Sequence, residues 1–153
     1  YLVPAFTGLG TPYWNAKSRG VLSGLTRDTG VNEIVRATVE SVAYQTYDLF
    51  EAMKNDGLRP KLVRVDGGMV KNNWFSQFLS DVVNVKVLRP KVDETTALGA
   101  AFMAGLQIGV YKSLKDISKN WHLDKKFSPK MKNPSRNKLL KGWSAAIKKT
   151  LSN

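Results

Sequence analysis

The stretch Val-Arg-Val-Asp-Gly-Gly-Met-Val-Lys-Asn-Asn, residues 63–73, decides the fold. It opens with apolar residues on either side of Arg64, which is the alternation of a half-buried strand. Gly67 and Gly68 end the strand, and a segment with helical apolar spacing follows them. Two glycines at a strand end let a ligand approach the main chain, and a helix N-terminus beyond them suits phosphate. The stretch therefore predicts a ligand-binding turn, with an ordinary tight turn as the alternative.

The composition indicates one domain with a substantial core, because 42% of the 153 residues are hydrophobic and four are tryptophan. The absence of cysteine excludes disulfides and thiolate metal sites, and it fits a cytoplasmic protein. His122 is the only histidine, which argues against a histidine triad or a zinc site, and we expect no metal ligands. No apolar run approaches the roughly 20 residues that span a bilayer, so we expect no membrane span.

Positive charge is concentrated near the end of the chain. The net charge is +12, and residues 111–153 hold 12 Lys and Arg against two acids, Asp116 and Asp124. A basic helical tail of this kind raises the possibility of nucleic-acid contact. Arg136 is the only arginine in it, and no aromatic–basic pattern accompanies the lysines, so a solvated lysine-rich face is the preferred interpretation. We therefore expect no nucleic-acid partner.

A long helix is predicted before the glycine pair. Asn32 is expected to cap it, and Asp56-Gly57 to end it. Its expected buried stripe repeats at spacings of four and three, widened by Ala43 and Phe50: Val35, Val39, Val42, Thr46, Leu49 and Met53. Residues 1–26 before it are interpreted as short strands and turns, with Thr7-Gly-Leu-Gly-Thr as a structural turn.

Strands and helices alternate after the long helix. We expect a strand at 61–66, a helix near 72–83, and a strand at 85–88 stopped by Pro90. Three further helices are predicted: 95–106 capped by Asp93 or Thr95, a short one at 113–119, and a final amphipathic one capped by Asn133. Short connections between alternating elements predict an α/β fold, a mixed sheet flanked by helices. Its antiparallel strands are expected from the early segments.

The predicted helix 95–106 has an unusually slim face of small residues, among them Gly99 and Ala100. A glycine inside a helix costs about 1 kcal/mol relative to alanine, which needs a compensating reason. Close packing against another backbone or a ligand is the reason that we infer.

Four segments in order resemble the C-terminal domain of FGGY-family carbohydrate kinases, members of the actin/hexokinase/Hsp70 superfamily with its ribonuclease H-like fold. They are Pro4–Trp14, the pair Gly20–Leu25 and Glu33–Glu40, Val65–Asn72, and Glu94–Ala101. The first of them is most similar to the glycerol-kinase version of this loop. The resemblance covers nearly the whole chain and implies that residues 1–153 are the nucleotide-side domain of a longer, two-domain protein. The start at Tyr1, without an initiator methionine, leads to the same expectation.

The resemblance also implies a site and a reaction. Residues matching Gly67, Gly68 and Asn72 would bind the nucleotide, and those matching Gly99 and Ala100 would pack at the hinge with the N-terminal domain. The full enzyme would use ATP and Mg²⁺ to phosphorylate glycerol, as a cytoplasmic protein and a homo-oligomer. The catalytic base is expected upstream of Tyr1, so no catalytic residue is assigned in this chain. Glu40 and Asp66 are interpreted as structural.

Two alternatives stay open. Another FGGY kinase, acting on a pentulose or a different polyol, would share these motifs, because the residues that contact the substrate lie upstream. A free-standing basic module that binds nucleic acid through residues 111–153 is the alternative from a different class.

Overall fold

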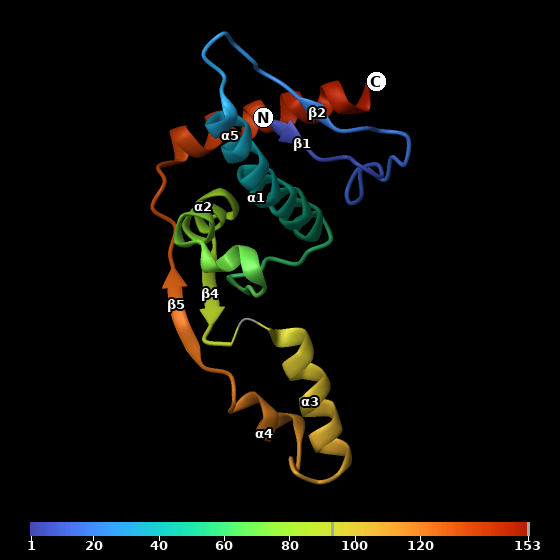
Figure 1. Ribbon diagram of the computed structural model, residues 1–153, viewed down its shortest axis with the longest axis vertical. Helices are drawn as coiled ribbons and strands as arrows, with labels where there is room; N and C mark the ends of the chain where they lie inside the picture. The colour runs from blue at the N-terminus through green and yellow to red at the C-terminus, as the bar shows by residue number, and fades with distance from the viewer. Residues whose placement is uncertain (93, 153) are drawn as a thin grey trace.

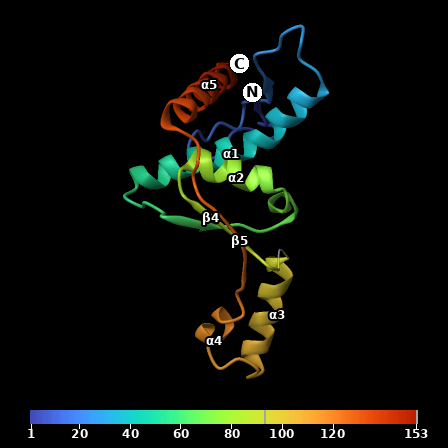
Figure 2. The ribbon, with the colours of Figure 1, turned by 90° about the vertical axis from the view of Figure 1, so that its left-hand side faces the viewer.

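The computed structural model describes residues 1–92 and 94–152 and arranges them as two small sheets with helices around them (Figure 1). The strands are β1 (Leu2–Val3), β2 (Val21–Leu22), β3 (Leu62–Arg64), β4 (Lys86–Pro90) and β5 (Leu123–Phe127). The helices are α1 (Val31–Asn55), the 3-10 turn η1 (Gly68–Lys71), α2 (Asn73–Val83), α3 (Thr95–Gln107), α4 (Leu114–Ser118) and α5 (Asn133–Leu151). In Figures 1 and 2, α5 lies at one end of the molecule and α3 with α4 at the other.

A mixed sheet is present, but its antiparallel strand is not one of those that the sequence suggested. β3 and β4 pair in parallel, and β5 pairs antiparallel to β4. The early strands β1 and β2 pair with each other in a separate two-stranded sheet. β5 lies within the basic segment 111–153, where only helices were predicted, because its exposed charged residues hide the strand pattern. The basic segment is therefore part of the sheet and of the core.

Helix α1 begins two residues earlier than predicted, and a different residue occupies its N-cap position. Gly30 occupies the N-cap position, and its backbone N–H donates to the carboxylate of Glu33 at 2.8 Å. The prediction that Asn32 caps the helix is therefore wrong, since Asn32 lies inside it. The predicted end is confirmed, because Asp56 follows the last helical residue and Gly57 has a positive φ of 84°.

The expected buried stripe of α1 is only partly buried. Val39 and Phe50 pack against the core, but Val35, Val42 and Leu49 are exposed. The helix buries a neighbouring face instead, which carries Ser41, Ala43, Tyr44 and Asp48. The structure therefore corrects the prediction of a single inward stripe.

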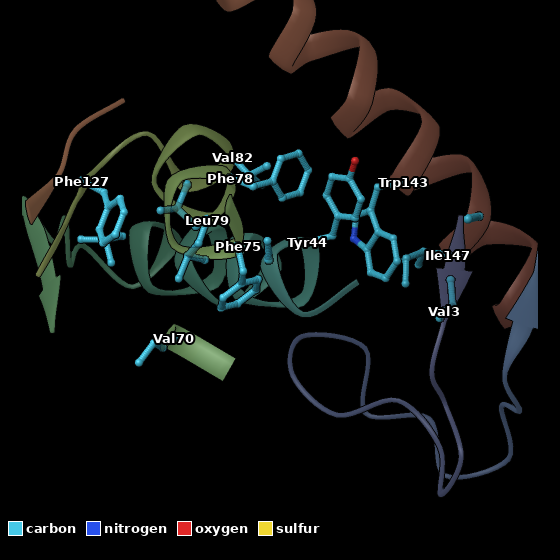
Figure 3. Close-up of a cluster of buried hydrophobic side chains, with 14 of the residues drawn as sticks. Val3, Tyr44, Val70, Phe75, Phe78, Leu79, Val82, Phe127, Trp143 and Ile147 are labelled. Carbon is cyan, nitrogen blue, oxygen red and sulfur yellow. The ribbon is translucent and has the colours of Figure 1, made fainter. Parts of the chain in front are cut away.

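The core lies between α1, α2 and α5, with aromatic rings at its centre (Figure 3). Tyr44 of α1 stacks on Trp143 of α5 with ring centroids 5.3 Å apart, and its edge meets Phe78 of α2 at 5.6 Å. Offset stacked and edge-to-face pairs are the favourable geometries for aromatic rings. Three helices far apart in sequence are thus joined through one tyrosine.

Three further element ends differ from their predictions. Pro90 does not stop β4 but forms its last residue, where it pairs with Leu123 of β5. Thr95 is the first residue of α3 and does not cap it, and Asp93, the other predicted cap, lies outside the described residues. Asn133 begins α5, whose N-cap position is held by Lys132 without a side-chain bond. The helices near 72–83 and 113–119 are confirmed.

Candidate nucleotide site

The glycine pair leads from strand β3 into the short turn η1. Gly67 has φ +85° and ψ 174°, a backbone conformation that residues with a Cβ rarely adopt. Gly68 begins η1, and a Cβ built at Gly68 would meet no atom of residues 1–92 or 94–152 within 4 Å. The structure therefore leaves open space over Gly68, as a surface that receives a ligand requires.

Asn72 joins η1 to α2 and acts as the N-cap of that helix. Its side-chain oxygen Oδ1 accepts hydrogen bonds from the backbone N–H groups of Trp74 at 2.9 Å and Phe75 at 3.2 Å. Its Nδ2 group makes no hydrogen bond within the part of the chain that the structure describes. Because Oδ1 is engaged by the cap, Nδ2 is the group that could donate to a ligand.

Asn72 also lines a surface hollow of about 330 Å³ between α1 and the start of α2, whose other lining residues are Asn32, Val35, Arg36, Val39 and Trp74. The Arg36 guanidinium lies 5.3 Å from the centre of the Trp74 ring and pairs with Glu40 at 2.7 Å. The hollow therefore combines an aromatic edge, a cation and an amide donor. Gly67 and Gly68 are not among its lining residues, so the structure groups only Asn72 of the three predicted nucleotide residues with it.

Arg89 of β4 holds η1 through hydrogen bonds to its carbonyl groups. The sequence did not single out this residue. Its Nη1 donates to the carbonyl oxygens of Val70 at 2.8 Å and Lys71 at 3.2 Å. Its Nε pairs with Asp124 of β5 at 2.7 Å. One arginine thus connects the turn after the glycines with both strands of the antiparallel pair. An arginine just before the proline that ends a strand was the available signal, but the sequence does not show which carbonyls it reaches.

Two of the carboxylates, Glu40 and Asp48, accept hydrogen bonds from neighbouring side chains. Glu40 accepts from Arg36 and from the Tyr44 hydroxyl, the latter at 3.1 Å. Asp48 is buried between α1 and α5, and burial raises the pKa of its carboxyl, while hydrogen bonds from Trp143 and Tyr13 act in the opposite direction. Within residues 1–92 and 94–152, no group of three His, Cys, Asp or Glu side chains could hold a metal ion. Asp66 is exposed beside Gly67.

The predicted hinge residues lie on the open face of α3. In the described ranges, no atom lies within 4 Å of a Cβ built on Gly99, and Ala100 is exposed. A different glycine of this helix is closely packed within the chain. A Cβ at Gly105 would lie 2.8 Å from the Tyr111 ring, which makes an edge-to-face contact with Phe102. The close approach inferred for Gly99 therefore has no partner among the described residues.

Comparison of the sequence with known proteins identifies related carbohydrate kinases. The sequence model of the FGGY family of carbohydrate kinases, C-terminal domain, matches residues 1–108. Glycerol kinase 1 of Pseudomonas aeruginosa is 57% identical over 152 residues, which are 99% of this chain and 31% of that protein. A glycerol kinase of Alteromonas mediterranea is 53% identical over 96% of this chain and 30% of its own length. The chain thus spans about a third of the length of these curated relatives.

Solved structures give the same result. Plasmodium falciparum glycerol kinase with ADP superposes with a TM-score of 0.83 and 37% identity, over 98% of this chain and 30% of that one. Gluconate kinase from Lactobacillus acidophilus superposes with a TM-score of 0.71 and 27% identity, over 92% of this chain and 28% of that one. The predicted fold class, an actin/hexokinase-like mixed sheet flanked by helices, is confirmed. No helix in the described ranges is long and apolar enough to cross a membrane. The resemblance that the four motifs indicated is therefore confirmed, and the chain belongs to the FGGY family of carbohydrate kinases.

Proposed function

We propose that this chain is the C-terminal, nucleotide-side domain of an ATP-dependent glycerol kinase, which transfers the γ-phosphoryl group of ATP to a hydroxyl of glycerol. The observation that carries the proposal is identity above 50% with glycerol kinases over 96–99% of the chain. The solved structure of Plasmodium falciparum glycerol kinase with ADP also superposes on the chain, with a TM-score of 0.83 at 37% identity. The relatives are about three times longer, so the proposed activity belongs to a full-length protein.

In this proposal the turn after β3 holds the nucleotide. The open space over Gly68 would let the nucleotide approach the main chain of η1, and Asn72 Nδ2 would donate a hydrogen bond to it. Arg89 would act as a positioning residue, because it holds the carbonyl groups of the same turn. Phosphoryl transfer depends mainly on such positioning and on charge stabilisation, so a domain without a catalytic base can still be essential to it.

Mg²⁺ belongs to the proposal as the companion of ATP. The described part of the chain has no carboxylate and histidine cluster that fits the ion, so we assign it no ligand in this chain. The base that accepts the proton of the substrate hydroxyl is proposed to lie outside the chain. Glu40 and Asp48, whose oxygens are engaged by neighbouring side chains, are poorly suited to that role.

The rest of the protein enters the proposal as a partner. The N-terminal domain of the same protein would face the slim side of α3, where Gly99 and Ala100 are open to close packing. Domain closure there would shield ATP from water. We further propose a cytoplasmic homo-oligomer. The absence of cysteine and the use of ATP support that location.

A pentulose kinase is the second candidate within the family. Xylulose kinase from Lactobacillus acidophilus superposes with a TM-score of 0.70, but at 26% identity its similarity is lower than that of the glycerol kinase. The nucleic-acid alternative has less support. Phe127 and Trp143 of the basic segment are buried in the core, and we propose that the exposed lysines between them are a solvated face.

The test is ADP release by the full-length protein with saturating Mg–ATP and either glycerol or xylulose. The proposal predicts glycerol-dependent turnover, with xylulose giving a far lower kcat/KM. It also predicts that residues 1–153 alone give no turnover above the buffer blank. Preference for xylulose would move the assignment to a pentulose kinase, and turnover by the isolated chain would require a base within it. Salt-sensitive binding of DNA or RNA with no kinase activity would favour the basic module.

A further inference from the structure

A hollow lined by Arg64, the Arg64 hollow, has a volume of about 220 Å³ and lies between the end of β3, helix α3 and the segment that leads from α4 to β5. Val63 and Val65 pack against the core, which lies between α1, α2 and α5. Successive side chains along a strand point to opposite faces of the sheet, so Arg64 lies on the other face. Figure 2 shows α3 and α4 at the end of the molecule away from α5. The Arg64 hollow is therefore separate from the hollow beside Asn72, between α1 and α2.

One wall of the Arg64 hollow is apolar. Leu98 and Phe102 are four positions apart in α3 and share one face of that helix, and Ile117 of α4 lines the same hollow. The Phe102 ring makes an edge-to-face contact with Tyr111, with ring centroids 5.5 Å apart. This contact holds α3 against the segment that leads into α4. The apolar wall is therefore built by packing within the chain.

Another wall carries an arginine that stacks on a tryptophan. The guanidinium carbon of Arg64 lies 4.2 Å from the centre of the Trp121 ring, and both residues line the hollow. A cation this close to an indole face is attracted by the negative charge of the ring face. A guanidinium that stacks in this way keeps its N–H groups at the edge of its plane, where they can still donate. Trp121 therefore holds Arg64 in place without engaging its donors.

The Arg64 guanidinium has no acceptor within residues 1–92 and 94–152, where it makes neither a hydrogen bond nor an ion pair. Arg89 of the neighbouring strand is different, because its guanidinium donates to two carbonyl groups and pairs with Asp124. Lys91 also lines the Arg64 hollow, and none of the described lining residues is acidic. The hollow therefore combines an apolar wall with positive charge and with the N–H donors of an arginine that await an acceptor.

We propose that the Arg64 hollow binds a small aromatic carboxylate. The carboxylate would accept two parallel N–H bonds from Arg64, because the planes of a guanidinium and a carboxylate match in that geometry. The ring of the ligand would lie against Leu98, Phe102 and Ile117. The inference goes beyond the proposed function, since this ligand is neither the nucleotide nor glycerol and its site lies on the other face of the sheet.

The chemistry of the hollow selects this class of ligand. A sugar or a phosphate ester has many polar groups, which the apolar wall would leave without hydrogen bonds. A neutral apolar molecule would fill the hollow but would give the Arg64 donors no acceptor, and a hydrogen bond to a charged group contributes more than a neutral one. The volume is below the roughly 300–1,000 Å³ of pockets for drug-sized ligands, so the ligand must be small. A single aromatic ring with one carboxylate meets all three conditions.

The first test compares two probes on the full-length protein by fluorine NMR, without substrate. The probes are para-fluorophenylacetate and para-fluorophenylacetamide, which share the ring and differ in charge. The proposal predicts a Kd below about 1 mM for the acid and binding of the amide at least about tenfold weaker. Equal affinity for the two probes would overturn it. Absence of saturable binding of the acid up to about 10 mM would also overturn it, and that result is expected if another part of the full-length protein fills the hollow.

The second test locates the acid with variants of the full-length protein. Arg64→Gln removes the charge, and Arg59→Gln is the matched control, because Arg59 is also exposed but does not line the hollow. We expect binding at least about tenfold weaker in Arg64→Gln, intermediate in Arg64→Lys, which lacks the planar fork, and unchanged in Arg59→Gln. Unchanged binding in Arg64→Gln would overturn the proposal. Equal weakening by both glutamine variants would show attraction by net charge alone and would overturn it as well.

A competition experiment separates the Arg64 hollow from the nucleotide site. Saturating Mg–ADP should leave para-fluorophenylacetate bound, and stoichiometric displacement of the probe would contradict a separate site. The comparison of acid and amide uses the parent protein, so it decides the question even if Arg64→Gln does not fold. All of these measurements report binding and not turnover. A failed kinase assay therefore leaves them valid, and their failure leaves the proposed kinase function untouched.

Discussion

The indole Nε1–H of Trp143 donates to the Asp48 carboxylate at 2.8 Å and connects α5 to α1 across 95 positions of the sequence. Both residues are buried, and the bond lies beside the stacked rings of Tyr44 and Trp143. An ionised carboxyl in such a place is costly unless donors face it. Helix α5 is therefore attached to the core by a buried hydrogen bond as well as by apolar packing.

Replacing Trp143 with Phe should destabilise the full-length protein through this bond. The change keeps an aromatic ring but removes the donor, which leaves the Asp48 carboxylate with one partner fewer and should cost about 1–3 kcal/mol. Trp121→Phe is the matched control, since Trp121 is half-buried and stacks under Arg64 with the guanidinium 4.2 Å from its ring centre. Urea unfolding followed by fluorescence measures both variants. A Trp143→Phe loss no larger than the control's would contradict this role.

The pH dependence of Asp48→Asn should have a definite sign. Burial raises the pKa of Asp48 above its ordinary 3.8, so the folded state binds the proton more tightly than the unfolded state. The stability contributed by protonated Asp48 is complete below pH 3.8 and is lost as pH rises through the raised folded pKa. Asparagine does not ionise, so the free energy of unfolding of the variant minus that of the parent should increase with pH over this window and then level off. A decrease over the same window would show that hydrogen bonding outweighs burial at Asp48.

The sequence predicted most elements because their apolar spacing is local. The helix near 72–83 has a continuous buried face and its own cap in Asn72, and the structure confirms it. β5 was missed because Asp124, Lys125 and Lys126 have no apolar alternation, and its pairing depends on β4. The N-cap predictions were wrong where the backbone conformation, and not the type of side chain, determined the cap residue, as at Gly30.

The candidate site was predictable in part. Gly67, Gly68 and Asn72 lie in one motif, so they could be found together. Arg36 and Arg89 come near them only through tertiary packing, across the α1–α2 contact and the sheet. One sequence by itself does not show which residues of α1 and of the sheet pack beside this motif. The α1 stripe shows the opposite case, in which the spacing predicts burial that this chain alone does not supply.

Arg89 should affect ATP use through the position of η1. Arg89→Ala removes the donors to Val70 and Lys71, and each lost charged hydrogen bond is worth about 1.5–3 kcal/mol. We expect a KM for ATP raised about tenfold or more, a nearly unchanged KM for glycerol, and an intermediate value for Arg89→Lys. Steady-state kinetics of the full-length enzyme measures all three. An equal rise in both KM values, with the fold intact, would remove Arg89 from the nucleotide side.

Gly99 and Gly105 should respond differently to leucine. A Cβ at Gly99 meets nothing among the described residues, so Gly99→Leu should preserve the melting temperature and lower kcat by hindering domain closure. A leucine at Gly105 must displace the Tyr111 ring, and overpacking of this kind costs about 1–3 kcal/mol of stability. Thermal unfolding and turnover of both variants separate the two effects. Full activity of Gly99→Leu would argue against a hinge at that residue.

The most direct test of the nucleotide site is the pair of Michaelis constants of the full-length Gly68→Val enzyme. A Cβ at Gly68 has open space around it, so the substitution should leave folding intact while its side chain fills the space proposed for the nucleotide. We expect the KM for ATP to rise by about tenfold or more, the KM for glycerol to stay nearly unchanged, and Gly68→Ala to fall between valine and the parent. An unchanged KM for ATP in a folded Gly68→Val enzyme would contradict the placement of the nucleotide at this turn.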